Sequence, residues 1–280
     1  MSKQNYFPDR SWIVIIYYTR TTNVKVWETL MRIFQYWDTG TPPEEVAEWI
    51  ESFRIKNPDL KHRLYDRDAA AWFIRKYIGD REKRAFEACA VPAMQSDYFR
   101  YCAILAKGGV YVDADFRCVS PLSGLLRSAP NALIAVWDRH LVAGLLMVRR
   151  PRDVFLRACL DLATANVEAR WGPNSYMAAG PGVINAIRVL ADPRTEKVVT
   201  QGFDNEFGRK WQFPDLKARA AAAITITPEL VASLGAFTLV HILDTQPWIE
   251  TPIPAYKSTE LHWLKWRAPI YCEPASAEPD

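Results

Sequence analysis

A pair of carboxylates near the middle of the chain has the spacing of a cation site. Asp113 and Asp115 follow the apolar run Val110-Tyr111-Val112. Residues i and i+2 of a strand point the same way, so the two carboxylates converge on one small volume and repel each other. Mn²⁺ or Mg²⁺ would relieve that repulsion, because these ions prefer oxygen ligands and commonly add phosphate oxygens of a substrate. The spacing therefore predicts a metal site that takes a nucleotide diphosphate.

Two further charged residues precede this pair. Asp97 and Arg100 lie in a predicted helix over 96–107, which Ser96 is placed to cap and Gly108 to end. Residues three apart on a helix are neighbours. One interpretation of Asp97 and Arg100 is an ion pair on a solvent-facing helix surface, and the other is a pair of ligand-binding groups beside the two aspartates.

The surrounding sequence alternates between strand and helix patterns. Thr41 is predicted to cap the first helix, with Pro42 or Pro43 in its first turn, and Asp66 or Asp68 is predicted to cap the second. Such alternation favours a mainly parallel sheet with helices on its faces, and it places ligands at the carboxyl ends of the strands. The expected strands are 33–37, 64–65, 110–113, 133–136 and 144–148, and the expected later helices are 96–107, 152–167 and 182–190.

Composition bounds the class of protein. The chain has 280 residues, 49% hydrophobic and 24% charged, which is typical of a globular protein, and its net charge of +3 argues against a nucleic-acid partner. The apolar runs are shorter than the ~20 residues that span a bilayer. The N-terminus lacks the pattern of a secretory signal, so we expect a cytoplasmic protein. The 5 cysteines form no CxxC pair, so no zinc site is expected and the thiols are predicted to be reduced.

Eight positions of the central segment form one pattern, namely Ser96, Asp97, Arg100, Gly108, Gly109, Tyr111, Asp113 and Asp115. This pattern resembles the signature of the glycosyltransferase family whose sugar-binding region contains the DXD motif. That family includes fungal α-mannosyltransferases and bacterial capsular polysaccharide and lipooligosaccharide sugar transferases, and the large clostridial glucosylating toxins are distant relatives.

Looser matches extend the resemblance over about residues 32–250. The stretches Ile33–Trp37, Trp49–Pro58, Ala179–Gly182 and His241–Trp248 resemble segments of the same family. Three residues depart from the family pattern, with Phe34 in place of His, Ala179 in place of Thr and Pro247 in place of Ser. The departure at Phe34 puts a polar role at that position in doubt.

The resemblance implies a fold and an activity. The implied fold is a GT-A-like single α/β domain over 31–270, with a mainly parallel, Rossmann-like central sheet flanked by helices. An N-terminal extension over 1–30 has no clear role, and residues 271–280 are expected to form a flexible tail. The implied activity is transfer of a hexose from a nucleotide diphosphate sugar to a saccharide or glycolipid acceptor, dependent on Mn²⁺ or Mg²⁺ and retaining the anomeric configuration.

The resemblance also implies the roles of individual residues. Asp97 and Arg100 are the expected catalytic residues, facing the donor sugar, and Asp113, Asp115 and His241 are the expected metal ligands, with Asp244 as an alternative third ligand. Trp37 suits stacking on a nucleobase. The expected nucleotide-sugar-binding residues are Tyr36, Trp37, Asp97, Arg100, Gly109, Asp113, Ala114, Asp115, Gly180, Pro181 and Trp248.

Two other functions and one location stay open. A catalytically inactive sugar-nucleotide-binding protein would use the same fold. A phosphatase of the haloacid dehalogenase type would use the first Asp of Asp-x-Asp-x-Thr as its nucleophile, but Arg117 stands where that Thr is needed. The aromatic and basic segment Ser258–Arg267 fits either a packed helix or peripheral contact with the inner face of the plasma membrane. The sequence does not indicate an oligomeric state.

Overall fold

The computed structural model describes residues 31–129, 131–137, 139–207, 213–258, 266 and 268–273. The expected N-terminal extension over 1–30 lies outside the described residues, as do residues 274–280 of the expected tail. Most of the segment 259–267 is also outside them. Among the described residues, no helix has the length and apolar character needed to cross a bilayer.

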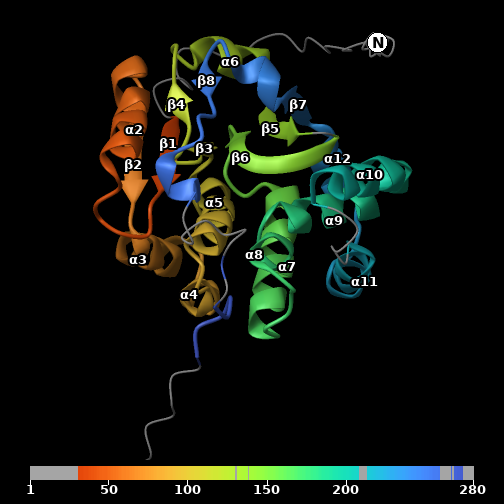
Figure 1. The fold of residues 1–280 in the computed structure, drawn as a ribbon. Coiled ribbons are helices and arrows are strands. Elements are labelled where there is room, and N and C mark those ends of the chain that lie inside the picture. The colour runs from red at the N-terminus through yellow and green to blue at the C-terminus, as the bar shows by residue number, and fades with distance from the viewer. Residues whose placement is uncertain are drawn as a thin grey trace, which may run out of the picture.

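A central six-stranded sheet organises the chain (Figure 1). Its strand order is β2-β1-β3-β6-β5-β7. β1 pairs in parallel with β2 and β3, and β5 pairs in parallel with β7, while β6 runs antiparallel to β3 and β5. The strands are β1 (Arg32–Tyr36), β2 (Lys61–Tyr65), β3 (Gly109–Val112), β5 (Ala132–Trp137), β6 (His140–Val148) and β7 (Phe237–His241). The sheet is therefore mainly parallel.

Helices cover both faces of this sheet, and Figure 1 shows α5 and α7 on the side opposite to α6. A small antiparallel ribbon, β4 (Arg117–Cys118) with β8 (Ile249–Glu250), lies on the α6 side. The α-helices are α2 (Glu44–Lys56), α3 (Arg67–Tyr77), α4 (Asp80–Ala88), α5 (Pro92–Lys107), α6 (Ser123–Ser128), α7 (Val154–Glu168), α8 (Ser175–Ala178), α9 (Pro181–Ala191), α10 (Glu196–Phe207), α11 (Phe213–Ala223) and α12 (Pro228–Gly235). The 3₁₀ helices are η1 (Pro193–Thr195), η2 (Ile242–Thr245) and η3 (Ala255–Ser258).

The alternation of side chains along each central strand divides the core between the two faces. On β3, Tyr111 packs in the larger cluster, with the apolar faces of α3, α5, α7 and α9. Val110 and Val112 pack in the second cluster, with residues of α2, α6 and β8. All four residues of β3 are buried, as expected for a strand covered on both faces. The predicted fold class, an α/β protein with a mainly parallel sheet flanked by helices, is confirmed.

Several helix boundaries differ from the prediction. The N-cap of α2 is Pro43 and not Thr41, whereas Asp66 caps α3 by accepting a hydrogen bond from Ala69 N at 2.8 Å. α5 begins at Pro92, so Ser96 lies inside the helix and its hydroxyl bonds the Tyr111 hydroxyl at 2.6 Å. A proline at the first helical position needs no hydrogen-bond partner for its nitrogen, which explains the earlier start. α4 was not predicted because its sequence, DREKRAFEA, is mostly polar.

Two glycines join α5 to β3 at a place where the packing leaves no space for a side chain. Gly108 and Gly109 have φ values of 64° and 108°. A Cβ on Gly109 would lie 2.6 Å from the carbonyl oxygen of Arg32, and one on Gly108 would lie 2.8 Å from that of Arg149. Because glycine alone tolerates both the conformation and the contact, these residues let β3 enter the sheet directly after α5.

Gly109→Ala is expected to lower the free energy of unfolding by about 2–4 kcal/mol, because the methyl group meets backbone at an unfavourable φ. Urea denaturation measures the change. Gly40→Ala is the matched control, since a Cβ at Gly40 has nothing within 4 Å, and it should change stability by less than about 0.5 kcal/mol. Equal stability of the two variants would contradict the close packing of β3 against β1.

Candidate functional site

The predicted carboxylates leave the sheet at the carboxyl end of β3. Asp113 directly follows Val112, and its backbone nitrogen donates a hydrogen bond to the Gly144 carbonyl of β6 at 2.9 Å. The chain then turns, and the Phe116 nitrogen donates to the Asp113 carbonyl at 3.1 Å. Asp113, Ala114 and Asp115 all line one cavity of about 710 Å³. The structure thus brings the two aspartates to the sheet edge where open α/β sheets bind ligands.

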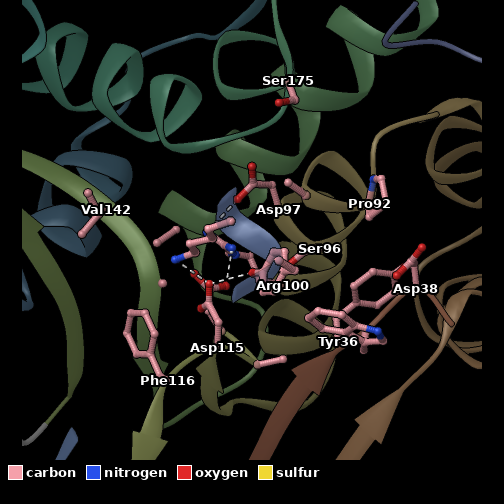
Figure 2. A pocket seen from close by; sticks show the side chains of 18 of the residues that line it. Tyr36, Asp38, Pro92, Ser96, Asp97, Arg100, Asp115, Phe116, Val142 and Ser175 are labelled. Carbon is pink, nitrogen blue, oxygen red and sulfur yellow. Dashed lines mark hydrogen bonds and ion pairs between the residues drawn. The ribbon is translucent and has the colours of Figure 1, made fainter. Parts of the chain in front are cut away.

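A buried arginine holds this acidic group together. The two terminal nitrogens of Arg100 contact Asp97 Oδ1 and Asp113 Oδ1, each at 2.8 Å. The Arg100 side chain is 4% exposed and that of Asp97 is 11% exposed. In Figure 2 the Arg100 side chain lies between Asp97 and the loop that carries Asp115. The pair at helical spacing is therefore buried, and the interpretation of a solvent-facing ion pair is wrong.

The surroundings of Arg100 favour its charged form. Its guanidinium lies over the Tyr111 ring, 4.9 Å from the centroid. Burial acts to lower the pKa of Arg100, but Asp113 and Asp97 act in the opposite direction and the pKa is raised. A permanent positive charge is therefore fixed between two carboxylates.

Burial has the opposite consequence for those carboxylates. Burial raises the pKa of Asp97 to about 7, while Arg100 lowers it and the nearby Asp113 raises it. The pKa of Asp113 is also raised by burial, against the effect of Arg100 and with a further contribution from the Asp115 charge. Burial thus opposes the ionised form of both carboxyl groups, and an additional cation in the cavity would favour that form.

Two glycines provide the space that these carboxylates occupy. A Cβ on Gly144 would lie 2.7 Å from Asp113 Oδ2, and a Cβ on Gly180 would lie 2.7 Å from Asp97 Oδ2. Gly180 thus lies against Asp97 and does not itself line the cavity, unlike Pro181, which does. Gly180 was predicted to contact the ligand, but in the structure it leaves space for the Asp97 carboxylate.

Asp115 has partners that the sequence analysis missed. Lys257 Nζ lies 2.8 Å from Asp115 Oδ2, and the Tyr256 hydroxyl donates to the same oxygen at 3.0 Å. Both residues belong to η3, and Tyr256 lies 141 residues after Asp115 in the chain. No motif marks these residues, because the contact depends on the path of the chain after β8.

Aromatic side chains line the cavity on both sides of the acidic group. In Figure 2, Tyr36 and Asp38 lie on one side of Asp115, and Phe116 and Val142 lie on the other. Other lining residues that the sequence analysis did not predict are Thr39, Thr41, Pro43, Pro92, Ala93, Ser96, Trp137, Ala143, Ser175, Tyr176, Ile242, Thr251 and Trp266. A polar centre between aromatic walls is typical of sites for small organic ligands.

Eight of the predicted site residues line this cavity, namely Tyr36, Trp37, Asp97, Arg100, Asp113, Ala114, Asp115 and Pro181. Trp37 follows β1 and its ring meets the Tyr256 ring edge-on, with centroids 5.4 Å apart. Tyr36 is 3% exposed and its hydroxyl donates to Gln95 Oε1 at 2.6 Å. Tyr36 therefore belongs mainly to the core, whereas Trp37 stands at the cavity wall.

Three predicted residues lie elsewhere among the described residues. Gly109 begins β3, at the end of the strand opposite to Asp113, and serves the packing against β1. Trp248 packs over Gly124 of α6, where a Cβ would lie 2.8 Å from the indole Nε1. His241 ends β7, and its ring stacks on Trp137 with centroids 6.5 Å apart and an interplanar angle of 21°. None of the three lines the described part of the cavity wall.

The donor set at Asp113 and Asp115 fits a hard divalent cation. Within the described part of the chain, no three His, Cys, Asp or Glu side chains form a group that could hold a metal ion, so His241 does not join the two aspartates. Mg²⁺ and similar ions commonly take one or two carboxylates and complete their coordination with substrate phosphates and water. The two aspartates suffice for a cation of that kind.

The raised pKa of Asp97 predicts a pH dependence of stability. The folded protein keeps the Asp97 proton up to about pH 7, whereas the unfolded chain loses it near pH 4. Stability should therefore fall as pH rises between these values, by up to ~1.4 kcal/mol per pH unit from this group. Urea denaturation at pH 5, 6 and 7 in metal-free buffer measures it for the wild type and for Asp97→Asn, which cannot titrate. The stability of the variant relative to the wild type should rise with pH, and a constant difference would contradict the assignment.

Gly144→Ala is expected to lower the free energy of unfolding by about 1–3 kcal/mol, because the new methyl group overlaps the Asp113 carboxylate and the Phe116 ring. The measurement is thermal or urea denaturation. Gly235→Ala, where a Cβ has nothing within 4 Å, is the control and should be nearly neutral. A neutral Gly144→Ala variant would mean that Asp113 does not need this space.

Comparison with known proteins bears on the same stretch. Residues 43–135 match a family described as a glycosyltransferase sugar-binding region containing a DXD motif. The chain is 31% identical over 85 residues to the initiation-specific alpha-1,6-mannosyltransferase of Schizosaccharomyces pombe, which covers 28% of this chain and 22% of that protein. It is 24% identical over 119 residues to the enzyme of the same name from Candida albicans, covering 40% of this chain and 31% of that protein.

The chain thus aligns with less than a third of the length of these curated relatives. Among solved structures, the PaToxG glycosyltransferase is similar with a TM-score of 0.45 and 17% sequence identity, over 74% of this chain and 87% of that one. The resemblance to the DXD glycosyltransferase family is confirmed over residues 43–135, the stretch that contains Asp97, Arg100, Asp113 and Asp115.

Proposed function

We propose that this chain is a metal-dependent glycosyltransferase that moves a hexose from a nucleotide diphosphate sugar to a saccharide or glycolipid acceptor, with retention at the anomeric carbon. One observation carries the proposal. Asp113 and Asp115 meet the buried Asp97–Arg100 pair in a single cavity at the carboxyl end of β3, inside the stretch that matches the family.

Asp113 and Asp115 would hold Mn²⁺ or Mg²⁺, and the ion would supply Lewis-acid stabilisation of the charge on the leaving diphosphate. The residues of the chain prepare the site for it. Arg100 fixes the direction of the Asp113 carboxylate through the 2.8 Å contact. Because the terminal nitrogens of Arg100 are engaged by two carboxylates and the side chain is buried, we assign it a positioning role in place of the direct sugar contact expected from the sequence.

Asp97 is placed to recognise the donor sugar. It lines the cavity and is held by Arg100 on one side and by the space at Gly180 on the other. A carboxyl group fixed in this way forms hydrogen bonds with sugar hydroxyls in a defined direction, and this geometry discriminates between epimers. We therefore assign Asp97 to the hydroxyl groups of the hexose.

The nucleobase is assigned to the Trp37 side of the cavity. Trp37 follows β1, which neighbours β3 in the sheet, so the aromatic wall begins about one strand spacing, ~5 Å, from Asp113. Its ring offers an apolar face for stacking. The wall that contains Trp137 lies on the other side of β3, beyond β6, and is left for the acceptor.

If the acceptor is lipid-linked, peripheral contact of the segment Ser258–Arg267 with the inner face of the plasma membrane would bring the site to it, and a cytoplasmic location is part of the same proposal. The residues Leu261, Trp263 and Leu264 of that segment lie outside the described residues. Trp266, which is described, lines the cavity.

The experiment that tests the function measures release of nucleoside diphosphate from a panel of sugar nucleotides, with and without Mn²⁺ and with simple methyl glycosides as acceptors. GDP-mannose heads the panel because the curated relatives are mannosyltransferases. Release that depends on Mn²⁺ supports the transferase. Tight binding of a sugar nucleotide without any release would favour the non-catalytic binding protein.

Asp115→Asn should reduce this release by at least ~10²-fold, because one ligand of the cation is lost and leaving-group stabilisation is worth several kcal/mol. Addition of a chelator to the wild type should have the same effect. Asp59→Asn changes an exposed aspartate in a turn and is the matched control. A folded Asp115→Asn protein with normal turnover would refute the metal assignment.

A further inference from the structure

Lys257 places a positive charge on a predicted metal ligand. Its Nζ lies 2.8 Å from Asp115 Oδ2, and the Tyr256 hydroxyl donates to that same oxygen at 3.0 Å. The side chain of Asp115 is 12% exposed and that of Lys257 is 30% exposed. The lysine therefore reaches into the cavity from its rim, where it can also move away from the carboxylate.

The turn that carries Lys257 is anchored independently of this contact. The Ala255 nitrogen donates to Glu45 Oε1 of α2 at 2.7 Å, and the Lys257 nitrogen donates to the Pro254 carbonyl at 3.0 Å. The Tyr256 ring packs edge-on against Trp37. These contacts hold the backbone of η3 at the cavity, so the Lys257 ammonium stays near the acidic group even when it leaves Asp115.

The charges in the cavity make the lysine a substitute for the cation. Arg100 forms ion pairs with Asp97 and Asp113, and Lys257 forms an ion pair with Asp115. An ion bound to Asp115 Oδ2 at the usual ~2.1 Å and an ammonium in contact with the same oxygen repel each other. A divalent ion at Asp115 therefore competes with the Lys257 contact.

We propose that Lys257 is an exchangeable cation that neutralises Asp115 until a divalent ion binds, and that it then contacts the diphosphate of the nucleotide. This inference rests on the proposed function. The diphosphate brings new negative charge to the cavity at the moment when the ammonium loses its carboxylate partner. Since η3 keeps the ammonium at the rim of the cavity, the phosphate oxygens of a bound diphosphate would be new anionic acceptors for it.

The proposal predicts that removal of the Lys257 charge raises the affinity for Mn²⁺ and lowers the affinity for a nucleoside diphosphate. Lys257→Met keeps most of the side-chain volume and removes the ammonium. This variant should bind Mn²⁺ alone about 2–5-fold more tightly than the wild type, because the competing ion pair is gone. With saturating Mn²⁺, it should bind GDP or UDP at least about 5-fold more weakly, because a charged contact to phosphate is lost.

Electron paramagnetic resonance of free Mn²⁺ and isothermal titration calorimetry measure these two affinities without any turnover. Lys257→Arg keeps the charge and should resemble the wild type in both measurements. Lys61→Met removes an exposed lysine of β2 and controls for net charge. It should change neither affinity by more than about twofold.

The opposite signs separate the proposal from its alternatives. Unchanged Mn²⁺ affinity in Lys257→Met would show that the ammonium does not compete with the ion. Unchanged nucleotide affinity would refute the transfer of the ammonium to the diphosphate, and a loss of both affinities would mean that Lys257 only supports the structure. If the wild type binds neither GDP nor UDP with Mn²⁺, the proposed function fails and the transfer step with it, while the Mn²⁺ comparison still decides the competition.

Discussion

The contact on which the site depends is the buried bridge from Asp97 through Arg100 to Asp113. Each carboxylate lies 2.8 Å from a guanidinium nitrogen, and the arginine is 4% exposed. Breaking such a bridge leaves an uncompensated buried charge, which typically costs 3–5 kcal/mol, whereas an apolar replacement of the whole group is often neutral. Stability alone therefore does not explain this bridge, and its contribution is to orient the Asp113 carboxylate. It ties the middle of α5 to the loop after β3 and so fixes the direction of the first aspartate.

The backbone segments around the bridge have to approach one another closely for these charged groups to meet. Gly108 and Gly109 bring β3 back beside α5 within one turn of chain, and Gly144 and Gly180 leave room for the carboxylates themselves. The spacing of glycines and charges in the segment from Asp97 to Asp115 thus follows from packing. A helix of fixed pitch that ends at Lys107, a reversal at Gly108 and the strand Gly109–Val112 together place Arg100 beside Asp113.

Local pattern was enough to predict the acidic half of the site and most of the sheet. The strand–helix alternation and the place of Trp37 directly after β1 are properties of short segments, and both are found in the structure. Asp113 and Asp115 line one cavity as predicted, but they do so from a turn after β3 and not from the strand itself. The remaining features depend on distant parts of the chain. The contact of η3 with Asp115 has no sequence signal, because it follows from the path of the chain after β8, which pairs with β4. The stacking of His241 on Trp137 has none either, because it follows from the pairing of β7 with β5. The short helix α4 was missed because it buries few apolar side chains.

The two halves of the site differ in the way that their charges are held. Arg100 is buried and shared, so its position is fixed by the fold and the pKa of Asp97 is raised by the same burial. Lys257 is 30% exposed and stands on a short turn, so its ammonium has more freedom to move than the Arg100 guanidinium, which is 4% exposed. Under the proposed function, a permanent guanidinium inside and a movable ammonium at the rim would give one aspartate a fixed direction and leave the other available to an ion. Such an asymmetry would suit a site that holds its shape without a ligand and still admits a doubly charged ion together with an anion.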